Sequence, residues 1–310
     1  MTYDFLEQGG SHMVLDDLAR DVFQHVVSQE ALGTGCETDI QGLYAIGNLE
    51  KTDCSAAFYE PIMCLVLQGA KEAYARGRVI QYAAGDTLIV SHAVPVDAAV
   101  IQASPQAPYT ALALRLDLDL LRSMSAEFQG LEDVDSGNMH SLNAAASDAA
   151  LIDAVGRLFR LSFDPVETEA LAPLVLKEIH FRLLRASHGT MLRQLLKQDS
   201  PASRISKTIT TLRNNYKSNI LVADLAAASG MSLSAFHEHF KSVTSTTPLQ
   251  YQKDLRLLEA RQLLISGTKS VAATAYHVGY ESPTQFSREY SRKFGMSPSG
   301  QKSETFALSK

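Results

Sequence analysis

The sequence lacks the features of several specialised classes of protein. Its 310 residues include no tryptophan and only three cysteines. Cys36, Cys54 and Cys64 are too few and too scattered to form the disulfide framework of a small secreted domain. No uncharged apolar run approaches the about 20 residues that cross a bilayer, and the N-terminus lacks a basic segment followed by an apolar one. We therefore expect a cytoplasmic protein outside the membrane.

The overall composition is that of an ordinary globular chain. Hydrophobic residues make up 45% of it and charged residues 20%, which excludes collagen-like and disordered classes. At about 100–200 residues per domain, the length predicts two domains. Gly10-Ser11-His12-Met13 reads like the remnant of a removed affinity tag, so residues 1–13 are kept out of the fold argument. The alternative is that this segment is native.

Charge is divided unequally along the chain. The net charge is −6, yet residues 201–310 hold 14 basic and 7 acidic side chains, a net +7, and residues 1–200 carry the remaining −13. Such asymmetry is typical of a basic module that binds a polyanion and is joined to an acidic module that does not. Nucleic acid is the first polyanion to consider, and a solvated basic face without a partner is the alternative.

Two periodicities divide the acidic part. Residues 40–119 contain short apolar runs such as 62–67 and 87–90, with turn residues between them, which predicts a small β-barrel or sandwich. Between about 144 and 197 the period becomes helical, and a stripe formed by Leu171, Leu174, Val175, Ile179 and Leu183 predicts an amphipathic helix. The stripe either forms a dimer interface or packs on the strands. Residues 199–203 are the best candidate for a linker.

The basic segment contains an internal repeat. Its copies are residues 226–240, followed by Pro248, and residues 275–290, followed by Pro298. Gly230 and Gly279 are 49 residues apart, and Phe236 and Phe286 are 50 apart. A repeat of this length predicts one supersecondary unit present twice.

Each copy has the pattern of a helix-turn-helix. An alanine-rich helix is followed by a turn glycine, and then by Ser232 or Ser282 as the N-cap of a second helix. Two aromatic residues four apart in that second helix anchor one face to a core, and its other face is polar. Residues 249–265, with apolar positions at Tyr251, Leu255, Leu258 and Leu263, predict a helix that connects the two copies.

These motifs resemble the AraC/XylS family of transcriptional regulators. The C-terminal likeness rests on residues 226–232, on Pro248 with Tyr251, Arg256, Ala260 and Leu263-Leu264, and on residues 278–282 with Phe286 and Phe294-Gly295. The N-terminal likeness rests on Tyr59-Glu60-Pro61, Gln68-Gly69-Ala70-Lys71, Gly85-Asp86 and Ala103-Ser104-Pro105. The resemblance implies an α+β chain of two domains: a cupin-like β-barrel with flanking helices, and an all-α domain with two helix-turn-helix motifs joined by a linker helix.

The resemblance implies a division into three parts beyond the first 13 residues. These are a cupin-like sensor domain at 14–143, a helical linker and candidate dimerisation segment at 144–200, and a DNA-binding domain at 201–310. It also implies a regulator, expected to be an activator that responds to a small-molecule effector. The partners are the major groove of double-stranded DNA, a second copy of the chain and RNA polymerase, and the location is the cytoplasm, in association with the nucleoid. No cofactor and no catalytic residue are expected.

The family pattern also places DNA-contacting side chains on both second helices. The base-facing positions are Ser234, His237, Glu238, Pro283, Thr284, Gln285 and Arg288. The phosphate-facing positions are Ser232, Lys241, Ser282, Arg292 and Lys293. Arg288 can form two hydrogen bonds to guanine and Gln285 two to adenine. Glu238 departs from the family pattern, and either accepts a hydrogen bond from cytosine or is simply solvated.

Two other classes of protein compete with this interpretation. A cupin-like domain can be an enzyme, but His92 has no second histidine near it in the strand region, and a single histidine cannot build a three-ligand metal site. We therefore expect no metal. A thiol sensor of oxidants or electrophiles is the other alternative, in which Cys54 would be more exposed than Cys64.

Overall fold

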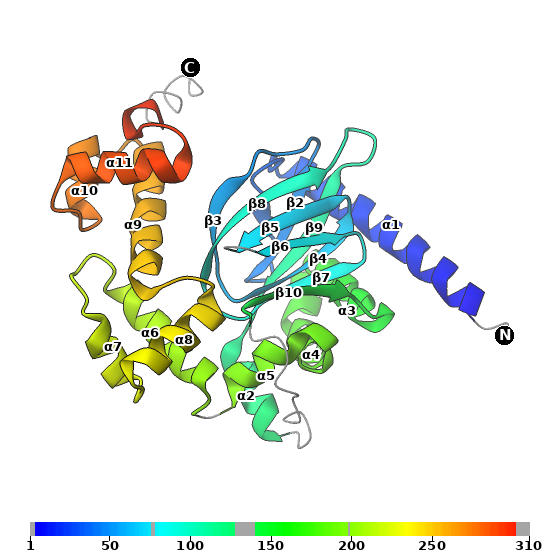
Figure 1. The fold of residues 1–310 in the computed structure, drawn as a ribbon. Coiled ribbons are helices and arrows are strands. Elements are labelled where there is room, and N and C mark those ends of the chain that lie inside the picture. The colour runs from blue at the N-terminus through cyan, green and yellow to red at the C-terminus, as the bar shows by residue number, and fades with distance from the viewer. Residues whose placement is uncertain (1–3, 76–77, 128–139, 198, 302–310) are drawn as a thin grey trace. The chain divides into compact units, whose positions relative to one another are not determined.

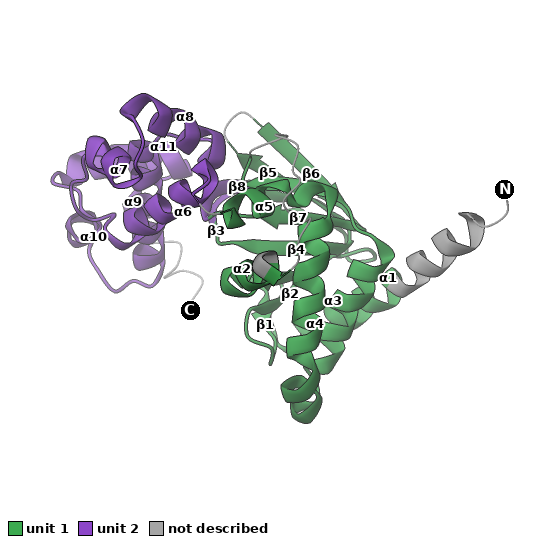
Figure 2. Ribbon diagram, turned by 90° about the horizontal axis from the view of Figure 1, so that it is seen from below, with its two compact units in different colours: residues 1–54, 59–92, 98–198 green, residues 55–58, 93–97, 199–310 purple. Residues whose placement is uncertain are grey.

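The computed structural model describes residues 4–75, 78–127, 140–197 and 199–301. It divides into two compact units, which Figure 2 colours separately. The first, called the sheet unit, comprises Met1–Cys54, Tyr59–His92 and Ala98–Gln198. The second, called the helical unit, comprises Ser55–Phe58, Ala93–Asp97 and Asp199–Lys310. The expected linker at 199–203 falls where the second unit takes over the chain.

Ten strands in the described part of the chain form two sheets. One has six strands in the order β1-β2-β9-β4-β7-β10, and the other has four in the order β3-β8-β5-β6. The strands are β1 Cys36–Glu37, β2 Leu43–Asn48, β3 Ser55–Tyr59, β4 Ile62–Gln68, β5 Ala70–Ala75, β6 Arg78–Ala83, β7 Asp86–Val90, β8 Val94–Gln102, β9 Tyr109–Arg115 and β10 Leu142–Ala146. The expected cupin-like, strand-rich domain is therefore present, although its strands form two sheets and not one closed barrel.

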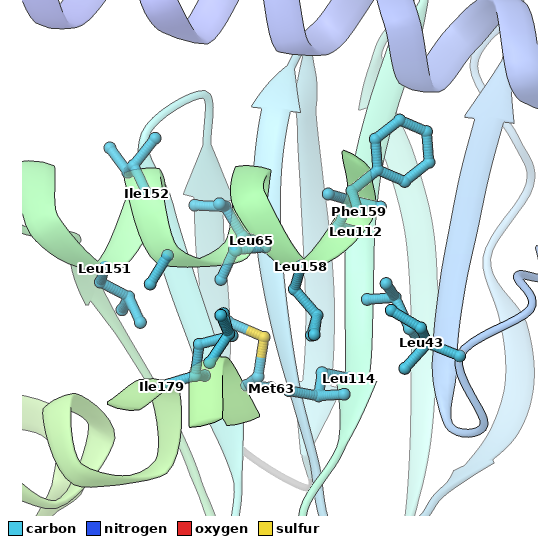
Figure 3. Close-up of a cluster of buried hydrophobic side chains, with 14 of the residues drawn as sticks. Leu43, Met63, Leu65, Leu112, Leu114, Leu151, Ile152, Leu158, Phe159 and Ile179 are labelled. Carbon is cyan, nitrogen blue, oxygen red and sulfur yellow. The ribbon is translucent and has the colours of Figure 1, made fainter. Parts of the chain in front are cut away.

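Helices cover one face of the six-stranded sheet. The helices of the sheet unit are α1 Asp4–Ser28, α2 Leu118–Glu127, α3 Ala149–Leu161, α4 Pro165–Arg185, the short 3-10 helix η1 Ser187–Gly189 and α5 Thr190–Leu196. Leu158 of α3 and Ile179 of α4 are fully buried against Met63, Leu65 and Leu112, as Figure 3 shows. Since side chains alternate along a strand, this packing turns the intervening strand residues toward the other sheet.

The first helix begins inside the segment that the sequence analysis set aside. Residues 1–3 lie outside the described residues, and α1 runs from Asp4 through the Gly-Ser-His-Met segment to Ser28. Further along this helix, Leu18, Val22 and Val26 are buried in the core of the sheet unit. The C-terminal half of α1 is therefore an integral part of the fold.

The amphipathic helix expected around 171–183 is α4. Val175, Ile179 and Leu183 of its stripe are buried in the core of the sheet unit, whereas Leu171 is 43% exposed and Leu174 is 65% exposed. A helical face of about 100° cannot bury both edges of a wider apolar stripe against one sheet. Part of the stripe packs on the strands and part is left on the surface.

The helical unit contains the two predicted helix-turn-helix motifs (Figure 1). Its helices are α6 Pro201–Asn214, α7 Val222–Ala228, α8 Leu233–Thr244, α9 Pro248–Ile265, α10 Val271–His277 and α11 Pro283–Phe294. A second core, which includes Leu257, Ala260, Val278 and Phe286, holds α9, α10 and α11 together. Across the described helices of both units, none is long and apolar enough to cross a membrane.

Candidate nucleic-acid interface

The first helix-turn-helix consists of α7 and α8. Gly230 takes the turn with φ +62°, a conformation that costs glycine little. The Ser232 hydroxyl accepts a hydrogen bond from the Ala235 amide (3.3 Å) and so caps the start of α8. Phe236 and Phe240, whose ring centroids are 5.7 Å apart, are fully buried. One face of α8 is thereby fixed to the core, and the opposite face is free for a ligand.

The second helix-turn-helix, α10 and α11, repeats this construction. Gly279 takes the turn with φ +91°, and the Ser282 hydroxyl accepts a hydrogen bond from the backbone amide of Gln285 (3.3 Å). Phe286 and Tyr290 are fully buried, with ring centroids 5.5 Å apart. The turn glycine, the serine cap and the aromatic pair predicted from the sequence are present in both copies.

The polar faces of α8 and α11 lie on the surface. The side chains of Ser234, His237 and Glu238 are exposed on α8, and those of Thr284, Gln285 and Arg288 are exposed on α11. Pro283 is partly buried at the first turn of α11. Six of the seven expected base-facing residues are thus exposed within the first two turns of a second helix, and their contact with bases remains a prediction.

The five expected phosphate-facing residues differ in how available their side chains are for a phosphate. Lys241 and Arg292 are exposed cations, while Ser232 and Ser282 already use their hydroxyls as helix caps. Lys293 is 20% exposed, and its ammonium lies 3.4 Å from the carboxylate of Asp254, which is 1% exposed. Lys293 therefore has an internal anion that competes with phosphate.

A carboxylate that the sequence analysis overlooked orients α11. Glu289 accepts hydrogen bonds from the Lys253 ammonium (2.9 Å), from the Tyr280 hydroxyl (2.8 Å) and from the side-chain amide of Gln285 (3.2 Å). Burial alone would raise the pKa of Glu289, but these bonds outweigh burial and hold the pKa below its usual value. The ionised carboxylate therefore links α11 to α9, and it orients the Gln285 amide before any base is bound.

A second network, also overlooked, ties α9 to the segment between α6 and α7. Arg256 donates to the backbone carbonyls of Tyr216 (2.7 Å) and Ser218 (3.0 Å), and Gln252 donates to both of the same carbonyls. Arg256 belongs to the motif that carries the family resemblance, so this signal was present in the sequence. What the motif did not reveal is that the residue is structural.

Other chemistry has little support in the described part of the chain. No group of three His, Cys, Asp or Glu residues there could hold a metal ion. None of the three cysteines forms a disulfide: Cys54 is exposed, Cys36 is partly buried and Cys64 is buried. Burial raises the pKa of the Cys64 thiol, which disfavours the reactive thiolate.

Two helix-turn-helix motifs joined by one helix, in a chain that also has a two-sheet unit, define a class of two-domain regulators. Residues 39–191 match the family described as AraC-type transcriptional regulator N-terminus, and residues 225–302 match the helix-turn-helix domain family. The chain belongs to the AraC/XylS family of transcriptional regulators.

The curated relatives each match less than half of this chain. The thermoregulatory protein LcrF of Yersinia pestis is 30% identical over 131 residues, which cover 42% of this chain and 47% of LcrF. The regulator ExsA of Pseudomonas aeruginosa is 29% identical over 129 residues, covering 42% and 46% of the two chains. The activator RhaS of Escherichia coli O157:H7 is 32% identical over 100 residues, covering 32% and 36%. The chain spans about half the length of the curated relatives it matches.

Solved structures share the fold over a longer stretch. The unsaturated fatty acid-bound ToxT of Vibrio cholerae strain SCE256 superposes with a TM-score of 0.56 over 84% of this chain and 92% of ToxT, at 11% identity. ToxT of strain O395, bound to (E)-4-(8-methylnaphthalen-1-yl)but-3-enoic acid, gives a TM-score of 0.55 over 86% of this chain and 100% of ToxT, at 12% identity. At these identities the likeness concerns the fold.

Proposed function

We propose that this protein is a sequence-specific DNA-binding regulator of transcription that reads the major groove with α8 and α11. The observation that carries the proposal is the duplicated arrangement of a capped helix with one face anchored and the opposite polar face exposed. The net charge of +7 on residues 201–310 supplies the attraction to phosphate that such a reader needs. Charge alone would support binding to any polyanion, whereas the duplicated geometry favours a groove.

The connecting helix sets the spacing of the two readers. α9 has 18 residues, which at about 1.5 Å per residue gives about 27 Å. Successive turns of the major groove are about 34 Å apart, and the radii of the two reading helices add to the length of α9. Both readers therefore reach one face of one duplex.

Individual base contacts follow from side-chain chemistry. Arg288 is placed to donate two hydrogen bonds to guanine, and Gln285 is placed to pair with adenine. Glu238, with Ser234 and His237 beside it on α8, is placed to accept from cytosine. Thr284 and Pro283 offer smaller contacts at the start of α11. The proposed contacts to the DNA backbone are Ser232, Ser282, Lys241, Arg292 and Lys293, of which Lys241 and Arg292 are exposed cations.

A selection from random DNA tests this proposal. The full chain is mixed with a randomised duplex pool, bound duplexes are amplified over several rounds, and binding is then titrated against salt. We expect a motif that spans two successive major grooves, with affinity well above that for random duplex. Weak binding that depends steeply on salt and enriches no motif would overturn sequence-specific reading.

We further propose that the sheet unit binds a small-molecule effector, and that the protein activates transcription through a contact with RNA polymerase. RhaS, 32% identical to this chain over 100 residues, is named a transcriptional activator. ToxT, which shares the fold, is solved with an unsaturated fatty acid bound. A cytoplasmic, nucleoid-associated location follows from the DNA partner. The relatives are named as regulators, which favours regulation over a cupin-type enzyme, and the buried Cys64 does not favour a thiol sensor.

Dimerisation through α4 is the remaining part of the proposal. Phe163, Val166, Leu171 and Leu174 are exposed apolar side chains at the end of α3 and along α4. Leu174→Glu should shift the protein toward the monomer in sedimentation velocity at micromolar concentration. The matched control is Leu249→Glu, because Leu249 is 54% exposed on α9 and lies outside the stripe. A wild-type monomer, or equal effects of both variants, would contradict dimerisation through α4.

A further inference from the structure

A lysine lies on the face of the four-stranded sheet that is turned toward the six-stranded sheet. Lys71 of β5 pairs with Tyr82 of β6 across the four-stranded sheet. It shares its face of β5 with Ala73 and Ala75, which are both buried, and Tyr82 is 2% exposed. The neighbouring Glu72 lies on the opposite face, where it hydrogen-bonds side chains at the surface. Lys71 therefore belongs to the inner face of its sheet.

The facing sheet contributes two polar side chains to the same region. Met63 and Leu65 pack against the helices, so Cys64 between them faces the other way. On β9, Leu112 packs against the helices, which by the same alternation directs Tyr109 to the inner side. Small and apolar residues (Val66, Ala111 and Ala113) occupy the other inner positions of β4 and β9.

These side chains form one cluster, which we call the Lys71 cluster: Lys71, Tyr59, Cys64, Tyr82 and Tyr109. The Lys71 ammonium is hydrogen-bonded to the Tyr59 hydroxyl and lies 5.7 Å from the centroid of the Tyr59 ring. Tyr82 is hydrogen-bonded to Tyr59 as well. Cys64 interacts with both Lys71 and Tyr109. All five residues belong to the sheet unit.

One hydroxyl of the cluster lacks a satisfactory partner. Tyr109 is 0% exposed, and within the described part of the chain its hydroxyl makes no hydrogen bond of good geometry. Its polar neighbour is the thiol of Cys64, a weak hydrogen-bonding group. Buried hydroxyls are nearly always paired, and an unpaired one leaves a donor available for a ligand.

The cluster is positively charged at neutral pH. Burial raises the pKa of the Cys64 thiol and of the Tyr82 and Tyr109 hydroxyls, so all three are neutral. Burial lowers the pKa of Lys71, but Tyr59 and Cys64 raise it, and the net direction is upward. Among the described residues, the ionisable groups that act on Lys71 are Tyr59 and Cys64, and neither is a carboxylate. Lys71 is partly buried; a partly desolvated ammonium without an anion is unfavourable, and a ligand that brings one relieves the cost.

We propose that the Lys71 cluster binds the acid group of an organic carboxylate, with Lys71 as counter-ion and the Tyr59 and Tyr109 hydroxyls as hydrogen-bond donors. A single cation among neutral groups suits a single negative charge, which favours a carboxylate over a phosphate. The inner-face side chains beside the cluster are alanine and valine, so we expect the part of the ligand next to its acid group to be apolar. This inference rests on the proposed effector function and names the chemical class of the effector.

The test measures whether the full chain distinguishes acids from neutral analogues. The probes are octanoate and 4-phenylbutanoate, each paired with its primary amide, and binding is measured by calorimetry and by thermal unfolding. We expect the wild type to bind at least one acid at least about tenfold more tightly than its amide, the effect of one charge-assisted hydrogen bond. Amides that bind as tightly as both acids, or no binding by either acid, would overturn the proposal.

Variants assign the effect to Lys71. Lys71→Met retains an apolar chain of similar length and should lose the preference for acid, with the acid affinity falling about tenfold. Lys71→Arg retains the cation and should keep the preference. Lys51→Met is the matched control, because Lys51 is exposed in the loop before β3, and it should bind like the wild type. A Lys71→Met variant with a native circular dichroism spectrum and unchanged acid affinity would overturn the assignment.

A parallel measurement separates this inference from the proposed function. Binding of the full chain to its selected duplex is titrated for the wild type and for Lys71→Met without any acid. If the protein binds DNA specifically but binds neither acid, the carboxylate proposal is wrong and the proposed regulator function is retained. Failed specific DNA binding together with acid binding removes the proposed DNA-reading function and leaves the cluster as a carboxylate site.

Discussion

The carbonyl oxygen of Lys217 lies 2.3 Å from the position where a β-carbon on Gly279 would be. Arg256, which donates to the same carbonyl (3.2 Å), helps to hold this segment in place. At the equivalent turn of the first copy, the nearest atom to a β-carbon on Gly230 is the flexible Arg204 guanidinium, at 3.4 Å. The two turn glycines are therefore not equivalent. Gly230 is needed for its positive φ, whereas Gly279 is needed for its positive φ and because the backbone of Lys217 leaves no room for a side chain.

Alanine substitution at the two turns should separate these requirements. Gly230→Ala introduces a side chain at positive φ and should cost about 1–2 kcal/mol of unfolding free energy. Gly279→Ala has the same cost plus a steric overlap with backbone, and should be at least about 1 kcal/mol more destabilising. Urea denaturation followed by circular dichroism measures both. Equal losses would contradict the close approach of Lys217.

Arg288 and Lys241 should differ in the kind of DNA affinity that they supply. Arg288→Ala should weaken binding to the selected duplex by about 1–3 kcal/mol and relax the base preference at one position. Lys241→Ala should weaken binding to all duplexes alike and reduce the slope of log affinity against log salt by about one. Fluorescence anisotropy on selected and random duplexes measures both effects. An Arg288→Ala variant that loses as much affinity for random as for selected DNA would remove its base-reading role.

Lys293 should behave as a structural residue as well as a cation. Its removal leaves the buried carboxylate of Asp254 without this ion pair, so Lys293→Ala should lower the unfolding free energy by at least about 1 kcal/mol. Its effect on the salt slope should be smaller than that of Lys241→Ala. If Lys293→Ala reduces the slope fully and leaves stability unchanged, the ion pair with Asp254 has no importance in solution.

His180 should make the stability of the protein depend on pH near neutrality. Its Nε2 accepts a hydrogen bond from the Asp117 amide (2.9 Å), and Nδ1 is 2.7 Å from the Leu176 carbonyl. Burial lowers the pKa of His180, although the bond to Leu176 and the charge of Asp117 oppose the shift. The unfolded chain therefore binds the proton first as pH falls below about 6.5, and stability declines by at most about 1.4 kcal/mol per pH unit.

The variant His180→Gln tests the origin of this pH dependence. Glutamine can still accept a hydrogen bond from the Asp117 amide but does not titrate. The variant should therefore lose less stability than the wild type between pH 7.5 and 5.5. The difference between the two slopes is at most about 1.4 kcal/mol per pH unit, the limit for one proton. His188, whose pKa is also lowered by burial, supplies a remaining slope. Parallel stability curves for the variant and the wild type would exclude His180 as the source.

The sequence was most informative where a local pattern repeats. The glycine turn, the serine cap and the aromatic pair depend on neighbours within about one helical turn, and both copies matched the expectation. The face of α9 was harder to predict. The sequence suggested Tyr251, Leu255, Leu258 and Leu263 as its apolar stripe. Tyr251 is buried as predicted. The three leucines are only partly buried, and the buried leucines are Leu257 and Leu264. α9 contacts other helices on several sides, so apolar residues on it do not define one stripe.

Contacts between residues distant in the sequence could not be predicted from patterns. Glu289 looked like an ordinary charged residue on a helix, and its role depends on Lys253, 36 positions away. The Lys71 cluster gathers side chains from five different strands, and β-strand alternation alone did not reveal which faces of the two sheets meet. Packing between helices and strands determines such sites. A single sequence contains little information about which distant residues pack together.

Both helix-turn-helix motifs are proposed to read one duplex at a spacing fixed by α9. The most direct measurement inserts five base pairs, about half a turn of DNA, between the two halves of the selected motif and compares affinities for the full chain. We expect the affinity to fall at least about tenfold, because α9 cannot place α8 and α11 on opposite faces of the duplex. An unchanged affinity would show that a single helix-turn-helix reads the DNA and that the two motifs do not bind one duplex together.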